Sequence, residues 1–328
     1  MNGVTMTQPL LELKQLQTYF ISAKGTRIVK AVDGVSFTLA EGETLGIVGE
    51  SGSGKTVTSL SILRLLPPAA RIVGGEIWFG GENLLTKSER EMRRVRGSQI
   101  TMILQDPLMS LNPLFTIGEQ IAEPLRIHRG MHGSSIVERI KELLRGVRIP
   151  SPEVRMREYP HQMSGGMRQR IVGAISISCE PRLLIADEPT TSLDVTIQAQ
   201  YLKLLKDIQK QSGLGMIFIT HNIGIVAKMC DKVAVMYAGK LVERAPVRTI
   251  FNQPAHPYTE ALLNAMPKLA DRSERLWSIE GQPPDLADLP GGCPFSPRCP
   301  KAMDRCRREV PPEVQVDENH YTRCWLWE

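Results

Sequence analysis

The chain has 328 residues, a hydrophobic content of 42% and a formal net charge of +5. This length and apolar content suit one large, packed domain with an appendage. The charge is spread along the chain without a long basic block, so charge alone does not suggest binding to nucleic acid. No apolar run approaches the ~20 residues of a membrane-spanning helix. Residues 1–10 lack the basic start and apolar core of a signal peptide. We therefore expect a soluble chain in the cytoplasm.

The first strong pattern is a short apolar run, residues 44–48, which predicts a strand. Residues 49–56 follow it and read Gly-Glu-Ser-Gly-Ser-Gly-Lys-Thr, the phosphate-binding pattern G-x-x-x-x-G-K-[ST]. Residues 56–66 suit a helix that ends before Pro67. Strand, loop and helix are the context that this motif requires, which disfavours the alternative of a glycine-rich turn without a ligand.

The residue types of this loop predict how it binds a nucleotide. Its glycines allow positive φ angles and a close approach of the backbone to phosphate, and its N–H groups and the following helix N-terminus face the anion. We expect Lys55 to bridge the β- and γ-phosphates and Thr56 to hold Mg²⁺. The nucleotide-binding residues expected here are Gly49, Glu50, Ser51, Gly52, Ser53, Gly54, Lys55 and Thr56.

Residues 105–113 contain two prolines and an asparagine, whose turn chemistry predicts a loop. Residues 116–170 have helical periodicity, with breaks at Gly130, Pro150 and Pro152. Near the end of this region, Ser164-Gly165-Gly166 offers a hydroxyl and bare N–H groups before an apolar, helix-like run. This is a second predicted anion site at a helix start. It lies just upstream of the next strand, so we do not expect it to share a nucleotide with the phosphate loop of the same chain.

Residues 183–188 read Leu-Leu-Ile-Ala-Asp-Glu, which predicts a buried parallel strand that ends in two carboxylates. Asp187 suits a direct or water-mediated magnesium contact, and Glu188 suits the orientation of a water that faces the γ-phosphate. Alone, such a pair is usually a solvated loop. With the phosphate loop upstream, it completes the set of cradle, lysine, hydroxyl and carboxylate that ATP hydrolysis with magnesium needs.

Further strands are predicted at residues 216–220 and 232–237, with helical patterns between them, and this alternation favours a parallel sheet. After about residue 250 the composition changes and prolines cluster. We interpret this tail as an addition to the core.

Four of the six cysteines fall in this tail, with the spacing C-x₅-C-x₆-C-x₁₇-C. A reducing cytosol disfavours disulfides, so four nearby thiolates suggest a metal or cluster site. Zinc sites usually have tighter C-x₂₋₄-C pairs, iron–sulfur clusters also take four cysteines, and plain free thiols are the third alternative. The candidate ligands are Cys293, Cys299, Cys306 and Cys324. Cys179 and Cys230 lie in apolar helical surroundings and are expected in the core.

Over roughly residues 10–250, the chain resembles the ATP-binding subunits of ABC transporters. The stretch Ser164-Gly165-Gly166 is similar to their signature motif, with Met163 and Met167 in place of the usual leucine and glutamine. Met167 lies outside the groups that touch phosphate, so we expect activity to survive that departure. Three further residues resemble the Q-loop glutamine, the D-loop aspartate and the switch histidine of the family: Gln105, Asp194 and His221.

This resemblance implies an α/β fold: a P-loop NTPase of the ABC ATPase type, with a mixed sheet core, a helical subdomain and a cysteine-containing C-terminal extension. The nucleotide-binding domain would span residues 1–250, its helical subdomain about 106–170, and the extension 251–328. Two such domains would pair head to tail, each ATP lying between one phosphate loop and the partner's Ser-Gly-Gly.

The resemblance also implies roles for single residues. Gln105 would sense Mg²⁺ and the γ-phosphate, and His221 would contact the γ-phosphate across from Glu188. An aromatic residue near the N-terminus would stack on adenine. Its spacing from Leu16 favours Phe20, and Tyr19 is the alternative. Phe20 could equally be an ordinary strand residue without a role in binding.

The tail resembles that of one branch, the ATPases of dipeptide, oligopeptide and nickel importers. The residues that carry this resemblance are His256-Pro-Tyr-Thr259, the segment 292–299 and the loop 105–113. It implies a [4Fe–4S] cluster on the four cysteines, structural or sensory, with Zn²⁺ as the alternative. It also implies two integral membrane permease subunits, a second ABC ATPase subunit, more commonly a related chain than a second copy, and a periplasmic or extracellular solute-binding protein. No nucleic acid is expected, and the location would be peripheral, at the cytoplasmic face of the membrane.

The leading expectation is therefore the ATP-hydrolysing subunit of a di- or oligopeptide importer, with nickel as an alternative solute. A non-transport ABC ATPase of DNA repair or the ribosome is a second class. Repair types insert long coiled coils and ribosomal types carry two ATPase domains, and neither feature is found in this sequence. An iron–sulfur regulator that binds ATP without turnover is a third class, against which Glu188 argues.

Overall fold

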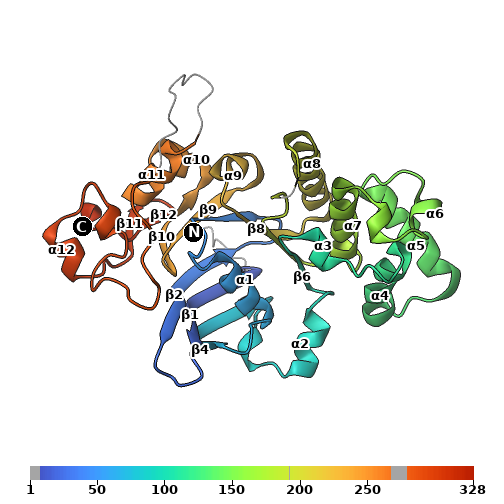
Figure 1. The fold of residues 1–328 in the computed structure, drawn as a ribbon, viewed down its shortest axis with the longest axis horizontal. Helices are drawn as coiled ribbons and strands as arrows, with labels where there is room; N and C mark the ends of the chain where they lie inside the picture. Colours follow the sequence, from blue (N-terminus) through green and yellow to red (C-terminus); the bar gives the residue numbers. More distant parts are fainter. Residues whose placement is uncertain (1–7, 192, 267–278) are drawn as a thin grey trace, which may run out of the picture. The chain divides into compact units, whose positions relative to one another are not determined.

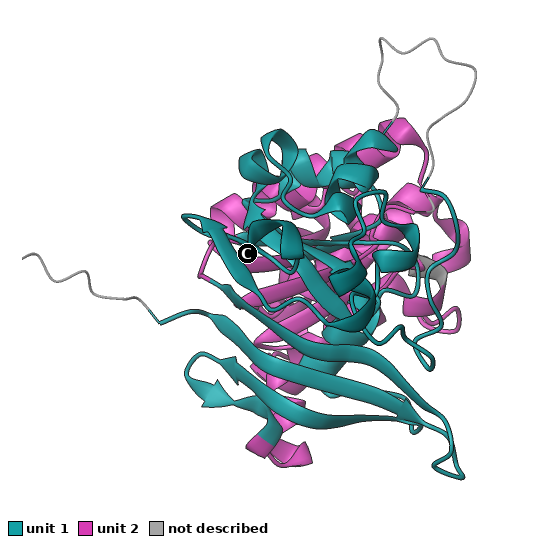
Figure 2. Cartoon of the chain, turned by 90° about the vertical axis from the view of Figure 1, so that its left-hand side faces the viewer, with its two compact units in different colours: residues 1–39, 44–85, 218–328 teal, residues 40–43, 86–217 magenta. Residues whose placement is uncertain are grey.

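The structure is a computed structural model, and it describes residues 8–191, 193–266 and 279–328 (Figure 1). The chain forms two units (Figure 2). The first contains residues 1–39, 44–85 and 218–328, and the second contains residues 40–43 and 86–217. The phosphate loop and the tail with the four cysteines belong to the first unit. The carboxylate strand and the predicted helical region belong to the second.

An antiparallel sheet opens the first unit. Its strand order is β2-β1-β4-β5, and its members are β1 (Leu11–Ile21), β2 (Ile28–Leu39), β4 (Ala70–Phe79) and β5 (Glu82–Asn83). On β1, Leu13 and Leu16 are both fully buried although they are three positions apart. Strict alternation would expose one of them, so the register shifts between them, and Gln15 takes φ 47°. The bulge keeps both leucines on the core face.

The second sheet of this unit carries the phosphate loop. Strand β3 (Thr44–Val48) is buried at every position and pairs in parallel with β9 (Lys232–Tyr237), as expected for a strand covered on both faces. Strand β9 then pairs antiparallel with β10 (Lys240–Pro246), followed by β12 (His320–Thr322) and β11 (Val314–Asp317). The sheet is therefore mixed, as expected, and the tail supplies two of its strands.

The helices of the first unit include α1, which begins at Lys55 of the phosphate loop. Gly46 on β3 lets α9 pack closely, because a Cβ there would lie 2.8 Å from Val226 and 2.9 Å from the sulfur of Cys230. Cys230 is buried there, as expected. The helices of this unit are α1 (Lys55–Leu63), α9 (Ile223–Met229), α10 (Val247–Asn252), α11 (Pro257–Asn264) and α12 (Asp304–Arg308).

The second unit contains the expected helical region and two parallel strands. Strand β6 (Ile100–Ile103) pairs with β7 (Leu183–Asp187), and β8 (Gly215–Thr220) runs from this unit into the first. The helices are α2 (Glu89–Val95), α3 (Pro107–Ser110), α4 (Ile117–Arg129), α5 (Gly133–Gly146), α6 (Pro152–Arg155), α7 (Gly165–Ile177) and α8 (Val195–Ser212).

Helix ends in this unit follow the local sequence. Thr116 and Glu119 form a capping box at the start of α4, and Gly130 ends the helix in the left-handed conformation. The predicted break at Gly130 is thus confirmed. Residues 105–113 differ from the expected loop, because they contain the single turn of α3. None of the described helices is long and apolar enough to cross a membrane.

Glu243 of β10 fastens the tail to the first unit. Its carboxylate is fully buried and accepts hydrogen bonds from the N–H groups of Ala255 (2.7 Å) and His256 (2.8 Å). His320 of β12 places its Nε2 2.8 Å from the same carboxylate. One side chain therefore joins β10, β12 and the segment before α11.

We predict that Glu243→Ala destabilises the first unit by about 3 kcal/mol or more, because it leaves two buried N–H groups and an imidazole without their acceptor. Urea unfolding followed by circular dichroism measures the change. Glu309→Ala is the matched control, since its exposed carboxylate pairs with exposed Arg305 (3.0 Å). Equal losses in the two variants would contradict the anchoring role of Glu243.

Candidate functional site

The phosphate loop is pressed against the backbone on two sides. Gly49 has φ 155°, and a Cβ there would lie 2.2 Å from the carbonyl oxygen of Met236. Gly54 has φ 105°, and a Cβ there would lie 2.2 Å from the carbonyl oxygen of Ala31. A clash with backbone cannot be relieved by a side-chain rotation, so both positions require glycine. The loop path is therefore set by β9 and β2 before any nucleotide arrives.

Lys55 is held over this loop. Its side chain is 6% exposed, and its Nζ donates to the carbonyl oxygens of Gly49 and Glu50, both at 2.8 Å. The ammonium is thus fixed beside the loop N–H groups, where a phosphate would meet both. Thr56, the expected magnesium ligand, is exposed at the start of α1. Ser51 and Gly52 are exposed as well, so the loop presents an open face.

In the second unit, the structure brings Gln105 and Glu188 together. Gln105 follows the end of β6, and its Nε2 donates to the Glu188 carboxylate at 3.2 Å. The hydroxyl of Thr191 donates to the same carboxylate at 3.0 Å. Glu188 has φ 45°, a left-handed conformation that is costly for a glutamate and concentrates at functional sites. Asp187, the last residue of β7, is buried.

The Ser-Gly-Gly stretch forms the N-terminus of α7. The hydroxyl of Ser164 accepts from the N–H of Met167 (3.4 Å), and Ser164 and Gly165 are exposed. A Cβ on Gly166 would lie 2.7 Å from the Ile197 side chain of α8. Exposed N–H groups at the start of a long helix form an anion-binding end. Met163 is buried, so the methionine fills the place of an apolar leucine.

Asp194 and His221 occupy the ends of elements. Asp194 caps α8, and its carboxylate accepts from the N–H groups of Thr196 (3.1 Å) and Ile197 (3.0 Å). His221 is exposed and directly follows β8. The loop 49–56, Gln105, Asp187 and His221 therefore each come at or just after the carboxyl end of a strand, where α/β sheets bind ligands.

The two aromatic candidates for adenine stacking differ in their surroundings. The Tyr19 hydroxyl donates to Asp33 (2.7 Å), which also pairs with Lys240 (2.7 Å). Burial and the Asp33 hydrogen bond raise the pKa of Tyr19 to about 12. The ring of Tyr19 is thus tethered, whereas Phe20 is half-buried on the same strand.

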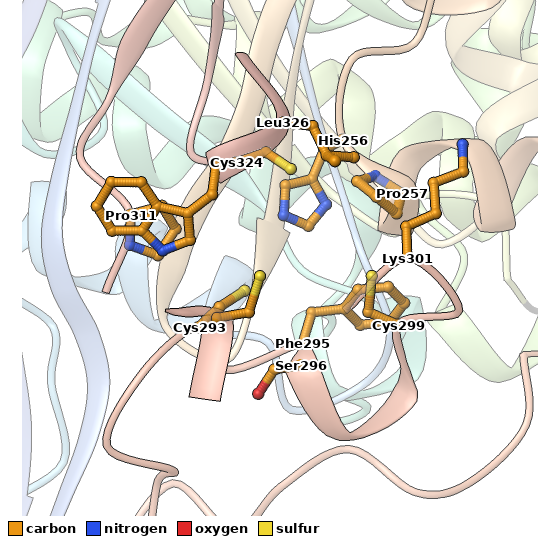
Figure 3. Close-up of a pocket in the computed structure, with 12 residues that line it drawn as sticks. His256, Pro257, Cys293, Phe295, Ser296, Cys299, Lys301, Pro311, Cys324 and Leu326 are labelled. Carbon is orange, nitrogen blue, oxygen red and sulfur yellow. The ribbon is translucent and has the colours of Figure 1, made fainter. Parts of the chain in front are cut away.

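The four tail cysteines line one cavity of about 20 Å³, shown in Figure 3. The segments that carry them approach closely, since the N–H of Cys293 donates to the carbonyl of Cys306 (2.7 Å). Burial raises the pKa of Cys293 to about 11 and also raises the pKa values of Cys299 and Cys324. Across the described residues, no group of three or more histidine, cysteine or acidic side chains is placed to hold a metal ion.

Cys179, the other cysteine expected in the core, is buried in the second unit.

The second unit also has an open groove of about 670 Å³ where α4 meets the segment after β6. Gln120 of α4 organises its wall, because its amide bonds the N–H and carbonyl of Asn112 (2.9 and 3.0 Å) and the carbonyl of Phe115 (2.9 Å). Phe115 and Ile127 line the groove and are 50% and 68% exposed. The groove therefore exposes apolar side chains, and the hydrogen bonds of Gln120 hold its wall in place.

Sequence reasoning missed several side chains that hold the site residues. Thr191 supports Glu188, and Tyr258 and Arg298 contact the backbone and carboxylate of Glu50. Thr191 lies just after the strand that carries the carboxylates. Tyr258 lies in the segment 256–259 and Arg298 in the segment 292–299, which carry the resemblance of the tail to the peptide-importer branch. That resemblance was the signal in the sequence that could have pointed to these two residues.

Comparison with known proteins gives concordant results. Residues 32–191 match the family model described as "ABC transporter", and residues 242–306 match "Oligopeptide/dipeptide transporter, C-terminal region". The chain is 49% identical to the dipeptide transport ATP-binding protein DppD of Bacillus subtilis, over 97% of this chain and 95% of that protein. It is 48% identical to the oligopeptide transport ATP-binding protein OppD of Salmonella typhimurium, over 93% and 90% of the two chains.

Among solved structures, the dimeric ATP-binding cassette MJ0796 bound to ADP and Pi superposes with a TM-score of 0.65 and 25% identity. The superposition covers 73% of this chain and 99% of the cassette. These matches agree with the phosphate loop, the Gln105–Glu188 pair and the mixed sheet described above. The chain belongs to the ABC transporter family of ATPases, which use ATP with Mg²⁺, and it carries the C-terminal region of the oligopeptide/dipeptide transporter branch.

Proposed function

We propose that this chain powers the import of di- or oligopeptides by hydrolysing ATP at the cytoplasmic face of a membrane. The observation that carries the proposal is the match to peptide transport ATPases along nearly the whole chain, tail included. The transported solute would pass through two separate integral membrane permease subunits. A solute-binding protein outside the membrane would deliver it, and a second, related ABC ATPase would complete the pair.

For the domain organisation, we propose a nucleotide-binding domain at residues 1–250 and an extension at 251–328. Two such domains would enclose ATP between the phosphate loop of one chain and the exposed Ser164 end of α7 in the other. The exposed Ser51, Gly52 and Ser164 support this arrangement, since each presents groups that a phosphate can reach. ATP would then join the two ATPases, and hydrolysis would let them separate.

For the chemistry, we propose that Glu188 orients the attacking water. Gln105 and Thr191 both donate to its carboxylate, which supports a fixed orientation. Lys55 would hold the β- and γ-phosphates, and Thr56, Asp187 and Gln105 would surround the Mg²⁺ that spreads the charge of the triphosphate. His221 and Asp194 would complete the site, and Phe20 would stack on adenine because the ring of Tyr19 is tethered.

The nickel importers are the second candidate within the same branch, since they share its tail. A DNA-repair or ribosomal role is disfavoured by the match to the peptide-transporter C-terminal region. A regulator that binds ATP without turnover would not need the strained, doubly hydrogen-bonded Glu188.

We also propose that the four tail cysteines hold a [4Fe–4S] cluster. In such a cluster each thiolate binds a different iron, so the sulfurs stand farther apart than around one zinc ion. All four cysteines line one cavity, which supports a shared thiolate site in the extension. The cavity has room for about one water, so the surrounding side chains would have to spread on loading. The cluster would brace the fold of the extension.

We expect Glu188→Gln to keep ATP binding and to lower kcat by about 10²–10⁴-fold, because the water loses its orienting carboxylate. Phosphate release by the assembled transporter and binding of a fluorescent ATP analogue measure the two effects. Glu180→Gln, at an exposed carboxylate that pairs with two arginines, should retain normal turnover. Near-normal hydrolysis in Glu188→Gln would refute the assignment.

The groove of the second unit suits a short helical segment of a permease, since apolar grooves bind the apolar face of a helix. Ile127→Glu should therefore reduce sedimentation of the ATPase with permease-containing vesicles by about tenfold or more, through burial of a charge. ATP binding by the free chain should be unchanged. The control is Val154→Glu, since Val154 is also exposed (56%, against 68% for Ile127) but does not line the groove. Equal effects of both variants would argue against docking at this groove.

Anaerobically purified protein should contain about four irons per chain, and Cys299→Ser or Cys324→Ser should lower the iron content. Elemental analysis and the visible absorption spectrum measure this. Cys179→Ser is the control, since that cysteine is buried in the other unit. Stoichiometric zinc, or no metal in protein kept free of oxygen, would overturn the cluster.

A further inference from the structure

Two residues of the tail hold Glu50, the second residue of the phosphate loop. Arg298 donates from Nη1 to one carboxylate oxygen (2.7 Å) and from Nη2 to the other (3.0 Å). The hydroxyl of Tyr258 accepts from the Glu50 N–H at 2.9 Å. Both the side chain and the backbone of Glu50 are therefore engaged by residues more than 200 positions away in the sequence.

The guanidinium of Arg298 has no donor to spare. Its Nε donates to the carbonyl of Glu280 (2.9 Å), and its two terminal nitrogens also reach the hydroxyl of Tyr237 and the carbonyl of Ile279, both at 3.3 Å. With the two bonds to Glu50, all five N–H groups are used. The side chain is only 4% exposed. A lysine could supply the charge here but not the planar fork.

The Arg298 guanidinium and the Tyr258 hydroxyl adjoin a cluster of three packed aromatic rings. The rings of Tyr237 and Tyr258 lie 4.5 Å apart, and Phe295 lies 5.3 Å from each. Phe295 directly precedes the turn Ser296–Arg298, from which the guanidinium extends. Because this packing is buried, Arg298 and Tyr258 form a rigid support rather than a loose surface contact.

Glu50 also connects to the lysine of the phosphate loop. Its carbonyl oxygen accepts from Lys55 Nζ at 2.8 Å, and accepts from the N–H of Ser53 at 3.2 Å. A shift of residue 50 would therefore move the ammonium and the loop N–H groups together. In addition, an unpaired carboxylate in this loop would repel the phosphates that the loop binds.

We propose that Arg298 is a positioning residue of the nucleotide site: it neutralises and immobilises Glu50 so that the phosphate loop binds the β-phosphate. The tail is then a working part of the ATP site in addition to any role in binding a cluster. The competing interpretation is that the ion pair only attaches the tail to the core.

The test compares MgADP dissociation constants by fluorescence titration in the full chain. Arg298→Met should weaken MgADP binding by about tenfold, since a buried charge-assisted fork is lost. Adding Glu50→Gln to Arg298→Met should recover most of that loss, because the unpaired carboxylate is removed. Arg298→Lys should give an intermediate loss. Arg305→Met, an exposed arginine in the same tail, should bind MgADP normally.

The rescue by Glu50→Gln separates the two interpretations, because simple attachment predicts that removing both partners weakens the tail without restoring nucleotide affinity. Arg298→Lys keeps the test informative if Arg298→Met does not fold. Unchanged MgADP binding in Arg298→Met or Arg298→Lys, or a double variant no better than Arg298→Met, would overturn the proposal.

Discussion

The close approach of the phosphate loop to two backbone carbonyls is the constraint on which the site depends. At Gly49 and Gly54 there is no room for a Cβ atom, because Met236 and Ala31 place their carbonyl oxygens 2.2 Å from where it would lie. The loop cannot move in these directions, and Lys55 folds back over the carbonyl oxygens of Gly49 and Glu50. Phosphate recognition is thereby built into the backbone before ligand binding, which lowers the cost of ordering the loop.

The tail is integrated with the phosphate-loop unit rather than appended to it. It adds β11 and β12 to the sheet of β3, buries Glu243 among three partners, and reaches the loop through Arg298. Arg298 directly precedes Cys299, one of the four cysteines around the tail cavity. The same short segment therefore faces the cavity on one side and Glu50 on the other. This placement gives a physical reason for the long tail, although the residues expected to act on ATP all lie outside it.

The sequence predicted the parts whose chemistry is local. The strand before the loop, the glycines, the end of α4 at Gly130 and the buried strand 183–187 all follow from short patterns and are found in the structure. Contacts between distant segments could not be predicted, because no spacing rule relates residue 50 to residues 258 and 298. The support of Glu188 by Thr191 and the bulge at Gln15 are specified by tertiary packing and strand register, which a single sequence does not display.

The proposed function requires this ATPase to act on a membrane permease for peptides. The most direct test is to recover the tagged chain from solubilised membranes and identify the proteins that accompany it by mass spectrometry. We expect two integral membrane subunits and a second ABC ATPase in comparable amounts. Recovery with ribosomal or DNA-bound proteins, and without any membrane protein, would leave the ATPase site intact but contradict the role in import.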